Sequence, residues 1–339
     1  MTSTYFLGAN SAQGFYSLYG GFPPRGGFLH IIKGGPGTGK SGFMRAIGAE
    51  AERRGMDVEY VLCSGDPDSL DGVYIPALNT AWVDGTAPHA LDPVIFGVIG
   101  DYVNLGRFCR TPFSPENQEA IRRITPAYKA LYAEGYEHIA AAGKCEVRGD
   151  FDLAPLEKRL DMILRRCPAD GAPYERRVFL RAISCRGLLS LADTLAGYGE
   201  VYEFTSSHGG GAPALELVRR EAERRGLYRV LSMSPLHPER IDAVMLPAAG
   251  IAFFDGSHGT GSARHIRLDS MLTGSPRSGH AAEAKTVASL RGKLLDLAVE
   301  KLSRAKALHD ELELEYRPYM DFPALTDYTN AEIERIFGN

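Results

Sequence analysis

The chain has 339 residues, of which 44% are apolar and 24% are charged, and its mean hydropathy is −0.17. These values are typical of a globular protein and exclude a disordered, collagenous or coiled-coil chain. The 38 basic and 42 acidic residues give a net charge of −4, so no overall basic excess indicates a nucleic-acid partner.

Neither the N-terminal residues nor the apolar segments indicate export or a membrane. The first residues lack a basic start and an apolar core, so no signal peptide is expected. The apolar run over residues 243–254 contains Pro247 and Gly250 and is too short to span a bilayer. Five cysteines without a C-x-x-C pair favour reduced thiols over a disulfide or metal framework. We therefore expect a cytoplasmic protein without a membrane partner.

Strands and helices are expected to alternate along the first half of the chain. Residues 28–32 have the apolar pattern of a short buried strand, and residues 40–54 that of a helix with one apolar face. Further buried strands are expected over residues 58–63 and 80–83. Two longer helices are expected over residues 117–142 and 283–316. This alternation predicts an α/β protein whose mainly parallel sheet is flanked by helices.

The sequence contains an internal repeat. The hexapeptide EAERRG at residues 50–55 recurs letter for letter at residues 221–226, an offset of 171. The same offset relates residues 82–86 to residues 253–257. The offset becomes 173 near the N-terminus, where Phe6 matches Phe179, and 177 near the C-terminus.

Collinear matches across both halves indicate a tandem duplication. The expected domains are residues 1–172 and residues 173–339, joined by a linker over residues 167–173 that contains proline and glycine. Two copies of a domain in one chain are expected to pack as an intramolecular pseudo-dimer, in the way that a homodimer packs.

Residues 34–41 match the pattern G-x-x-x-x-G-K-[ST] between an expected strand and an expected helix. Glycines let consecutive N–H groups curl around phosphate oxygens, and the helix N-terminus adds further free N–H groups. Lys40 would contact the outer phosphates, and the Ser41 hydroxyl would ligate Mg²⁺. Glycine-rich turns that bind no ligand rarely have both a lysine and a serine directly after the last glycine. The expected phosphate-binding residues are Gly34, Gly35, Pro36, Gly37, Thr38, Gly39, Lys40, Ser41 and Gly42.

This segment resembles the Walker A loop of P-loop NTPases, and its sequence PGTGKS is similar to that of AAA-type and kinase-type ATPases. With the duplicated layout and the segments at residues 66–72 and 83–89, the chain resembles a poorly characterised bacterial family of tandem P-loop ATP-binding proteins. The resemblance covers nearly the whole chain. It implies a P-loop fold that binds ATP with Mg²⁺, and it implies a second loop in the second half.

The second half departs from that pattern. The offset of 171 sets residues 205–212 opposite residues 34–41, so that Gly211 replaces Lys40 and Ala212 replaces Ser41. The remaining glycines could still form an anion nest, but both the phosphate cation and the metal hydroxyl are missing. We expect the first half to bind one nucleotide and the second half to be structural or regulatory.

A carboxylate at the end of a neighbouring strand usually helps to hold Mg²⁺ in such a site. Asp84 directly follows an expected strand, and metal ligand and turn residue are equally open roles for it. Asp66 lies in an acidic loop with Asp68 and Asp71. Asp66 could accept a proton in catalysis, or it could be a turn or helix-cap residue.

The repeat offers one comparison between these two acids. Asp84 is matched by Asp255, whereas Asp66 is matched by His237 in the half that lacks the lysine. Asp66 therefore could have changed together with the chemistry. Gly85 stands where an AAA-type motor carries a glutamate, which argues against fast hydrolysis. Thr86 and His89 follow in the same loop and could orient a water molecule.

Three functions follow from these residues. The preferred one is a P-loop ATPase with slow, Mg²⁺-dependent hydrolysis at Lys40 and Asp84. The second is a small-molecule or nucleotide kinase whose acceptor binds near residues 66–71, with Asp66 accepting a proton. The third is a non-catalytic, ATP-gated module that holds a protein partner. ATP is the default nucleotide because no guanine-reading N-K-x-D motif is present.

Overall fold

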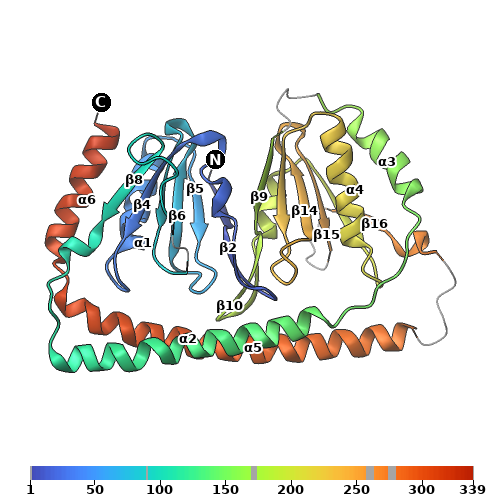
Figure 1. The fold of residues 1–339 in the computed structure, drawn as a ribbon. Coiled ribbons are helices and arrows are strands. Elements are labelled where there is room, and N and C mark those ends of the chain that lie inside the picture. The colour runs from blue at the N-terminus through green and yellow to red at the C-terminus, as the bar shows by residue number, and fades with distance from the viewer. Residues whose placement is uncertain (1, 89–90, 169–173, 257–262, 274–279, 339) are drawn as a thin grey trace.

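The computed structural model describes residues 2–88, 91–168, 174–256, 263–273 and 280–338. Two six-stranded sheets stand side by side, with helices packed against them. Two long helices run along one edge of both sheets (Figure 1). The chain is therefore an α/β protein with two similar halves. The predicted linker falls largely on residues 169–173, outside the described residues.

The first sheet has the strand order β1-β5-β6-β7-β4-β8. Its strands are β1 (Ser3–Phe6), β4 (Phe28–Lys33), β5 (Glu59–Leu62), β6 (Leu70–Ile75), β7 (Thr80–Asp84) and β8 (Gly100–Asn104). The expected strands are confirmed as β4, β5 and β7, and helix α1 (Lys40–Arg53) follows β4 as expected. Only β6, which was not expected, runs opposite to the other five strands. The sheet is mostly parallel but mixed.

The second sheet repeats this order and these directions as β9-β13-β14-β15-β12-β16. Its strands are β9 (Glu175–Val178), β12 (Glu200–Thr205), β13 (Arg229–Met233), β14 (Ile241–Leu246), β15 (Ile251–Asp255) and β16 (Arg264–Arg267). Helix α4 (Gly211–Arg224) takes the place of α1. The strand register also agrees, because Thr4 pairs with Tyr60 and Arg177 pairs with Leu231. These pairs are related by the predicted offsets of 173 and 171.

The two halves meet through reciprocal contacts. Phe6 N donates to Phe179 O at 2.9 Å, and Phe179 N donates to Phe6 O at 2.8 Å. These two residues match each other in the repeat. A residue that pairs with its own counterpart lies at the axis of a two-fold interface. The two similar halves are therefore joined through a reciprocal contact, and their origin by duplication stays a prediction.

Two hairpins extend this interface, β2–β3 (Gly8–Ser11 and Gly14–Ser17) and β10–β11 (Arg181–Ser184 and Gly187–Ser190). The tip of the first reaches the second half, where Gln13 donates to Glu239 at 3.1 Å. The tip of the second reaches the first half, where Arg186 pairs with Asp68. The repeat matches Gln13 to Arg186 by the offset of 173 and Asp68 to Glu239 by the offset of 171. The two contacts are therefore equivalent, and the exchange is again reciprocal.

The last helix of each half packs on the other half. Helix α3 (Ala154–Leu164) contacts α4, and its Leu156 and Leu160 are buried in one cluster with Leu215 and Val218. Helix α6 (Phe322–Phe337) contacts α1. The rings of Tyr328 and Phe43 stack there at 6.0 Å. The domain boundary near residue 172 stays a prediction. Each of these helices packs on residues from the other side of that boundary.

Helices α2 (Pro115–Gly143) and α5 (His280–Tyr316) form an antiparallel pair under both sheets (Figure 1). A Cβ on Gly135 would lie 3.4 Å from Leu302, so the glycine allows a close approach of the helices. Lys301 pairs with Glu134 at 2.6 Å. Both expected long helices are confirmed, and Ala298 and Leu302 of α5 are buried in one cluster with Ile139 of α2.

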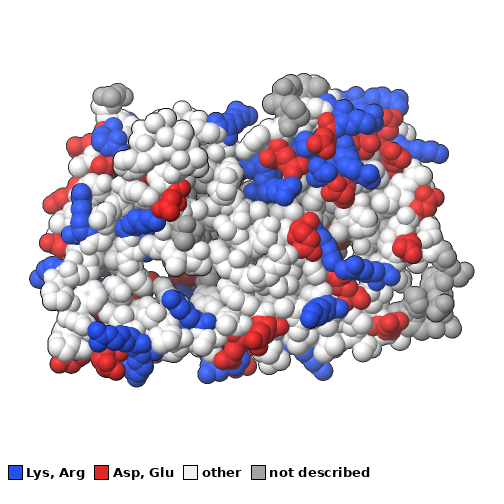
Figure 2. Space-filling model, viewed as in Figure 1, with Lys and Arg blue, Asp and Glu red and all other residues white. Residues whose placement is uncertain are grey.

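The remaining elements are short 3-10 helices. They span Tyr19–Gly21, Pro24–Gly26, Pro76–Leu78, Leu105–Phe108, Ala192–Gly197, Pro247–Ala249, Asp269–Met271 and Arg317–Tyr319. Among the described residues, no helix combines the length and the apolar character needed to cross a membrane. All five cysteines are free thiols. Basic and acidic side chains are interspersed on the face of the molecule that Figure 2 shows.

The Phe6→Ala variant tests the contact between the halves. Phe6 is fully buried at the interface, so its truncation should cost about 3–5 kcal/mol of the free energy of unfolding. The control is Phe96→Ala, because Phe96 is 67% exposed. The control should change stability by less than about 0.5 kcal/mol. Urea denaturation measures both, and equal losses would contradict the packing described.

Candidate functional site

The β4–α1 loop, residues 34–39, lies at the carboxyl end of a strand inside the first sheet. Gly37 and Gly39 have φ values of 65° and 86°, in the left-handed region that favours glycine. Gly39 caps α1 without a side-chain hydrogen bond, and the first turn contains no acidic residue. The helix N-terminus therefore keeps its positive end and uncapped N–H groups next to the loop.

Lys40 is held over this loop. Its Nζ donates to Gly35 O at 2.8 Å and to Gly34 O at 3.2 Å. The same Nζ lies 3.6 Å from Asp84 Oδ2. The Lys40 and Asp84 side chains are only 11% and 15% exposed. A buried charge needs hydrogen-bond and ion-pair partners, and Lys40 has both. The structure therefore brings the predicted residues Lys40 and Asp84 together.

The side chains of Asp84 and Ser41 each accept backbone hydrogen bonds next to the loop. Asp84 is the last residue of β7, and its Oδ1 accepts hydrogen bonds from Thr86 N at 2.8 Å and Thr86 Oγ1 at 2.5 Å. Ser41 Oγ accepts from Leu70 N at 2.9 Å. Asp84 thus makes the turn contacts and also faces the lysine. His89 lies outside the described residues.

The remaining predicted loop residues are Thr38, Pro36 and Gly42. Thr38 is buried, and its Oγ1 donates to Gly35 O at 2.8 Å, which ties the two sides of the loop together. Pro36 lies within the turn, and Gly42 lies in the first turn of α1.

Asp66 has the contacts of a turn residue. Its Oδ2 accepts from Ser69 Oγ at 2.9 Å and lies 3.5 Å from Lys306 Nζ on α5. The predicted acidic loop needs a correction, since Asp71 belongs to β6 and is 5% exposed. It is part of the antiparallel strand that the sequence did not indicate.

One face of α5 meets the β4–α1 loop, and sequence reasoning missed it. A Cβ on Gly37 would lie 3.2 Å from Glu313 Cβ, and a Cβ on Gly35 would lie 2.8 Å from the Tyr316 ring. The residues that share this face are Lys306, His309, Glu313 and Tyr316. Their spacing of three and four residues is that of one helix face. That spacing was available in the sequence, but the sequence predicted only a long helix over residues 283–316, with no functional residue on it.

The loop between β12 and α4 is one residue shorter than its counterpart. Residues 206–210 connect Thr205 to Gly211, whereas residues 34–39 connect Lys33 to Lys40. The predicted alignment therefore needs a correction, because Thr205 ends a strand and corresponds to Lys33 rather than to Gly34. Gly211 does stand at the position of Lys40.

A carboxylate fills the space where a lysine side chain would begin in the second half. A Cβ on Gly211 would lie 2.2 Å from Asp255 Cγ. Arg181, from the β10–β11 hairpin, donates to the neighbouring Asp242 at 2.8 Å. Burial raises the pKa of Asp255 to about 6, with a further rise from Asp242 and an opposing effect of Arg181. A lysine at position 211 would therefore require Asp255 to move.

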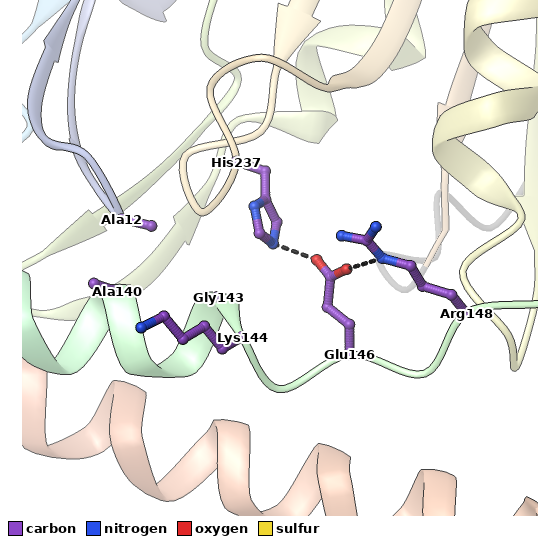
Figure 3. Close-up of a pocket in the computed structure, with 7 residues that line it drawn as sticks. All are labelled: Ala12, Ala140, Gly143, Lys144, Glu146, Arg148 and His237. Carbon is purple, nitrogen blue, oxygen red and sulfur yellow. Dashed lines mark hydrogen bonds and ion pairs between the residues drawn. The ribbon is translucent and has the colours of Figure 1, made fainter.

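His237, the counterpart of Asp66, lies at a hollow of about 570 Å³ between the β2–β3 hairpin and the end of α2. Figure 3 shows Glu146 between His237 and Arg148. Glu146 accepts from Arg148 at 2.7 Å and from Arg240 at 2.5 Å, and it also pairs with His237. Because His237 and Arg240 belong to the second half, Glu146 joins the segment that follows α2 to that half.

No family model, curated protein or solved structure matches the chain. Within the part of the chain that the structure describes, no group of three or more His, Cys, Asp or Glu side chains could hold a metal ion. A divalent ion near Ser41 and Asp84 would therefore need further oxygen ligands, such as those of a bound phosphate.

The Asp255→Asn variant tests the filled second loop. A carboxyl group whose pKa is raised from 3.8 to about 6 binds a proton more tightly in the folded state. Its contribution therefore lowers stability as the pH rises from about 4 to 6, by at most about 3 kcal/mol. Asparagine removes this dependence. Urea denaturation between about pH 4 and pH 7 should show the variant gaining on the native chain as the pH rises. Parallel curves would contradict the burial of the charge.

Proposed function

We propose that the β4–α1 loop binds ATP with Mg²⁺ and that the chain hydrolyses ATP slowly at this single site. The observation that carries the proposal is the position of Lys40. Its ammonium group contacts two loop carbonyls and lies 3.6 Å from Asp84, beside an uncapped helix N-terminus. A lysine with three donors can exchange such acceptors for phosphate oxygens without leaving the loop.

The residues present fit Mg²⁺-ATP. The glycine backbone and the first turn of α1 supply N–H donors, and Lys40 supplies the charge that neutralises the outer phosphates. Ser41 and Asp84 would hold the metal, which withdraws electrons from the phosphate oxygens when it is bound. The second half lacks the lysine and places Asp255 against Gly211. These features support one nucleotide per chain.

Slow hydrolysis is proposed because the residue after Asp84 is Gly85, and one oxygen of Asp84 is engaged by Thr86. The kinase alternative is not adopted. Its acceptor was expected near residues 66–71, where Asp66 contacts Ser69 and Lys306 and where Asp71 lies inside a strand. No observation on these residues favours an acceptor.

Thermal unfolding with and without Mg²⁺-ATP tests nucleotide binding. A ligand at about 100 times its Kd should stabilise the native chain by about 2.7 kcal/mol, which raises the Tm by about 4 °C. Lys40→Ala should lose this shift because the phosphate cation is gone. The control is Lys158→Ala, which removes an exposed lysine of α3 and should keep the shift. No shift for the native chain with any nucleotide would overturn the proposal.

The two aspartates can be compared in matched variants. Asp84→Asn should reduce Mg²⁺-dependent turnover by at least about tenfold, because it removes a metal ligand and the partner of Lys40. Asp66→Asn should keep turnover within about twofold, because a neutral amide can still accept the hydrogen bond from Ser69. Phosphate release at saturating ATP measures both. Unchanged turnover in Asp84→Asn would refute the role given to Asp84.

A further inference from the structure

The second half of the chain reaches the proposed nucleotide site through α5. The helix meets the β4–α1 loop at close range, because a Cβ on Gly37 would lie 3.2 Å from both Cβ and the carbonyl oxygen of Glu313. One turn further along the chain, Tyr316 approaches Gly35. The backbone and Cβ of Glu313 therefore pack against the β4–α1 loop, whose carbonyl groups accept hydrogen bonds from Lys40.

The side chain of Glu313 is open to water and lies next to a histidine. It is 44% exposed, and its Oε1 lies 3.6 Å from His309 Nδ1. Burial lowers the pKa of His309, and the charges of Lys306 and Lys40 lower it further, against Glu313 and Asp310. Because Glu313 packs against Gly37, the ion pair between Glu313 and His309 brings this histidine to the same side of the loop.

We infer that Glu313 is the catalytic carboxylate that orients and deprotonates the attacking water. The inference rests on the proposed function. A glutamate directly after the strand aspartate is missing, since Gly85 occupies that position. Glu313 is an acid that α5 brings to the same loop from the other half of the chain. His309 is a positioning residue, because it acts through Glu313.

The proposed step is balanced without a further reactant. The water oxygen forms a bond to the γ-phosphorus, and the bond from this phosphorus to the β–γ bridging oxygen breaks, which leaves ADP. The Glu313 carboxylate takes the proton of the water and returns it to solvent as phosphate leaves. A general base of this kind contributes about 10² to 10⁴ in rate.

The test is Glu313→Gln, which keeps the shape of the side chain and removes its basicity. Single-turnover hydrolysis should slow by at least about tenfold, whereas the Kd for Mg²⁺-ATP should stay within about twofold. Glu313→Asp should retain part of the activity. The matched control is Glu311→Gln, which changes an exposed glutamate of the same helix and should leave both quantities unchanged.

The result also separates this inference from the proposed function. If the native chain and Glu313→Gln bind Mg²⁺-ATP and hydrolyse it equally, the inference fails and nucleotide binding stands. Tighter binding with unchanged turnover would likewise overturn it, since Glu313 would then only repel the phosphates. Binding without any turnover in the native chain would overturn it too. No binding to the native chain would overturn the proposed function itself.

Discussion

Each sheet of this protein packs its connecting helix against a helix that belongs to the other half of the chain. Helix α6 lies on α1, and α3 lies on α4. Paired backbone hydrogen bonds between Phe6 and Phe179 join the sheets at the centre of this exchange. The hydrophobic free energy of each half therefore depends on the presence of the other half. This exchange also carries α5 past the first sheet and against the β4–α1 loop.

The same framework supports two different charge arrangements at equivalent places. In the first half Lys40 lies between loop carbonyls and Asp84. In the second half Gly211 leaves room for the Asp255 carboxyl group, and burial raises the pKa of that group. The two loops thus differ by the lysine, by the serine that follows it and by one residue of length, and the second has a carboxyl group against the start of its helix. A structural or regulatory role of the second half agrees with this difference.

Much of the first site could be predicted because it is local. Residues 34–41 contain their own turn, cation and hydroxyl, and the strand and helix around them have clear apolar patterns. Strand β6 could not be predicted with the same ease, because Leu70 to Ile75 is buried along its whole length and shows no alternation of buried and exposed residues to indicate a strand. The shorter second loop was also missed, since a single deletion among glycines and serines leaves no mark in the composition.

The sequence by itself determined the local chemistry: the glycine loop with Lys40 and Ser41, the repeat with its offsets, and the loss of the lysine at Gly211. These features depend on residues that are adjacent in the chain or compared position by position. Only the tertiary structure showed that Asp84, and not Asp66, lies beside Lys40. It also showed that Glu313 packs against Gly37. Those contacts join residues far apart in the chain, and they follow from the packing of α5 and the exchange of helices between the halves.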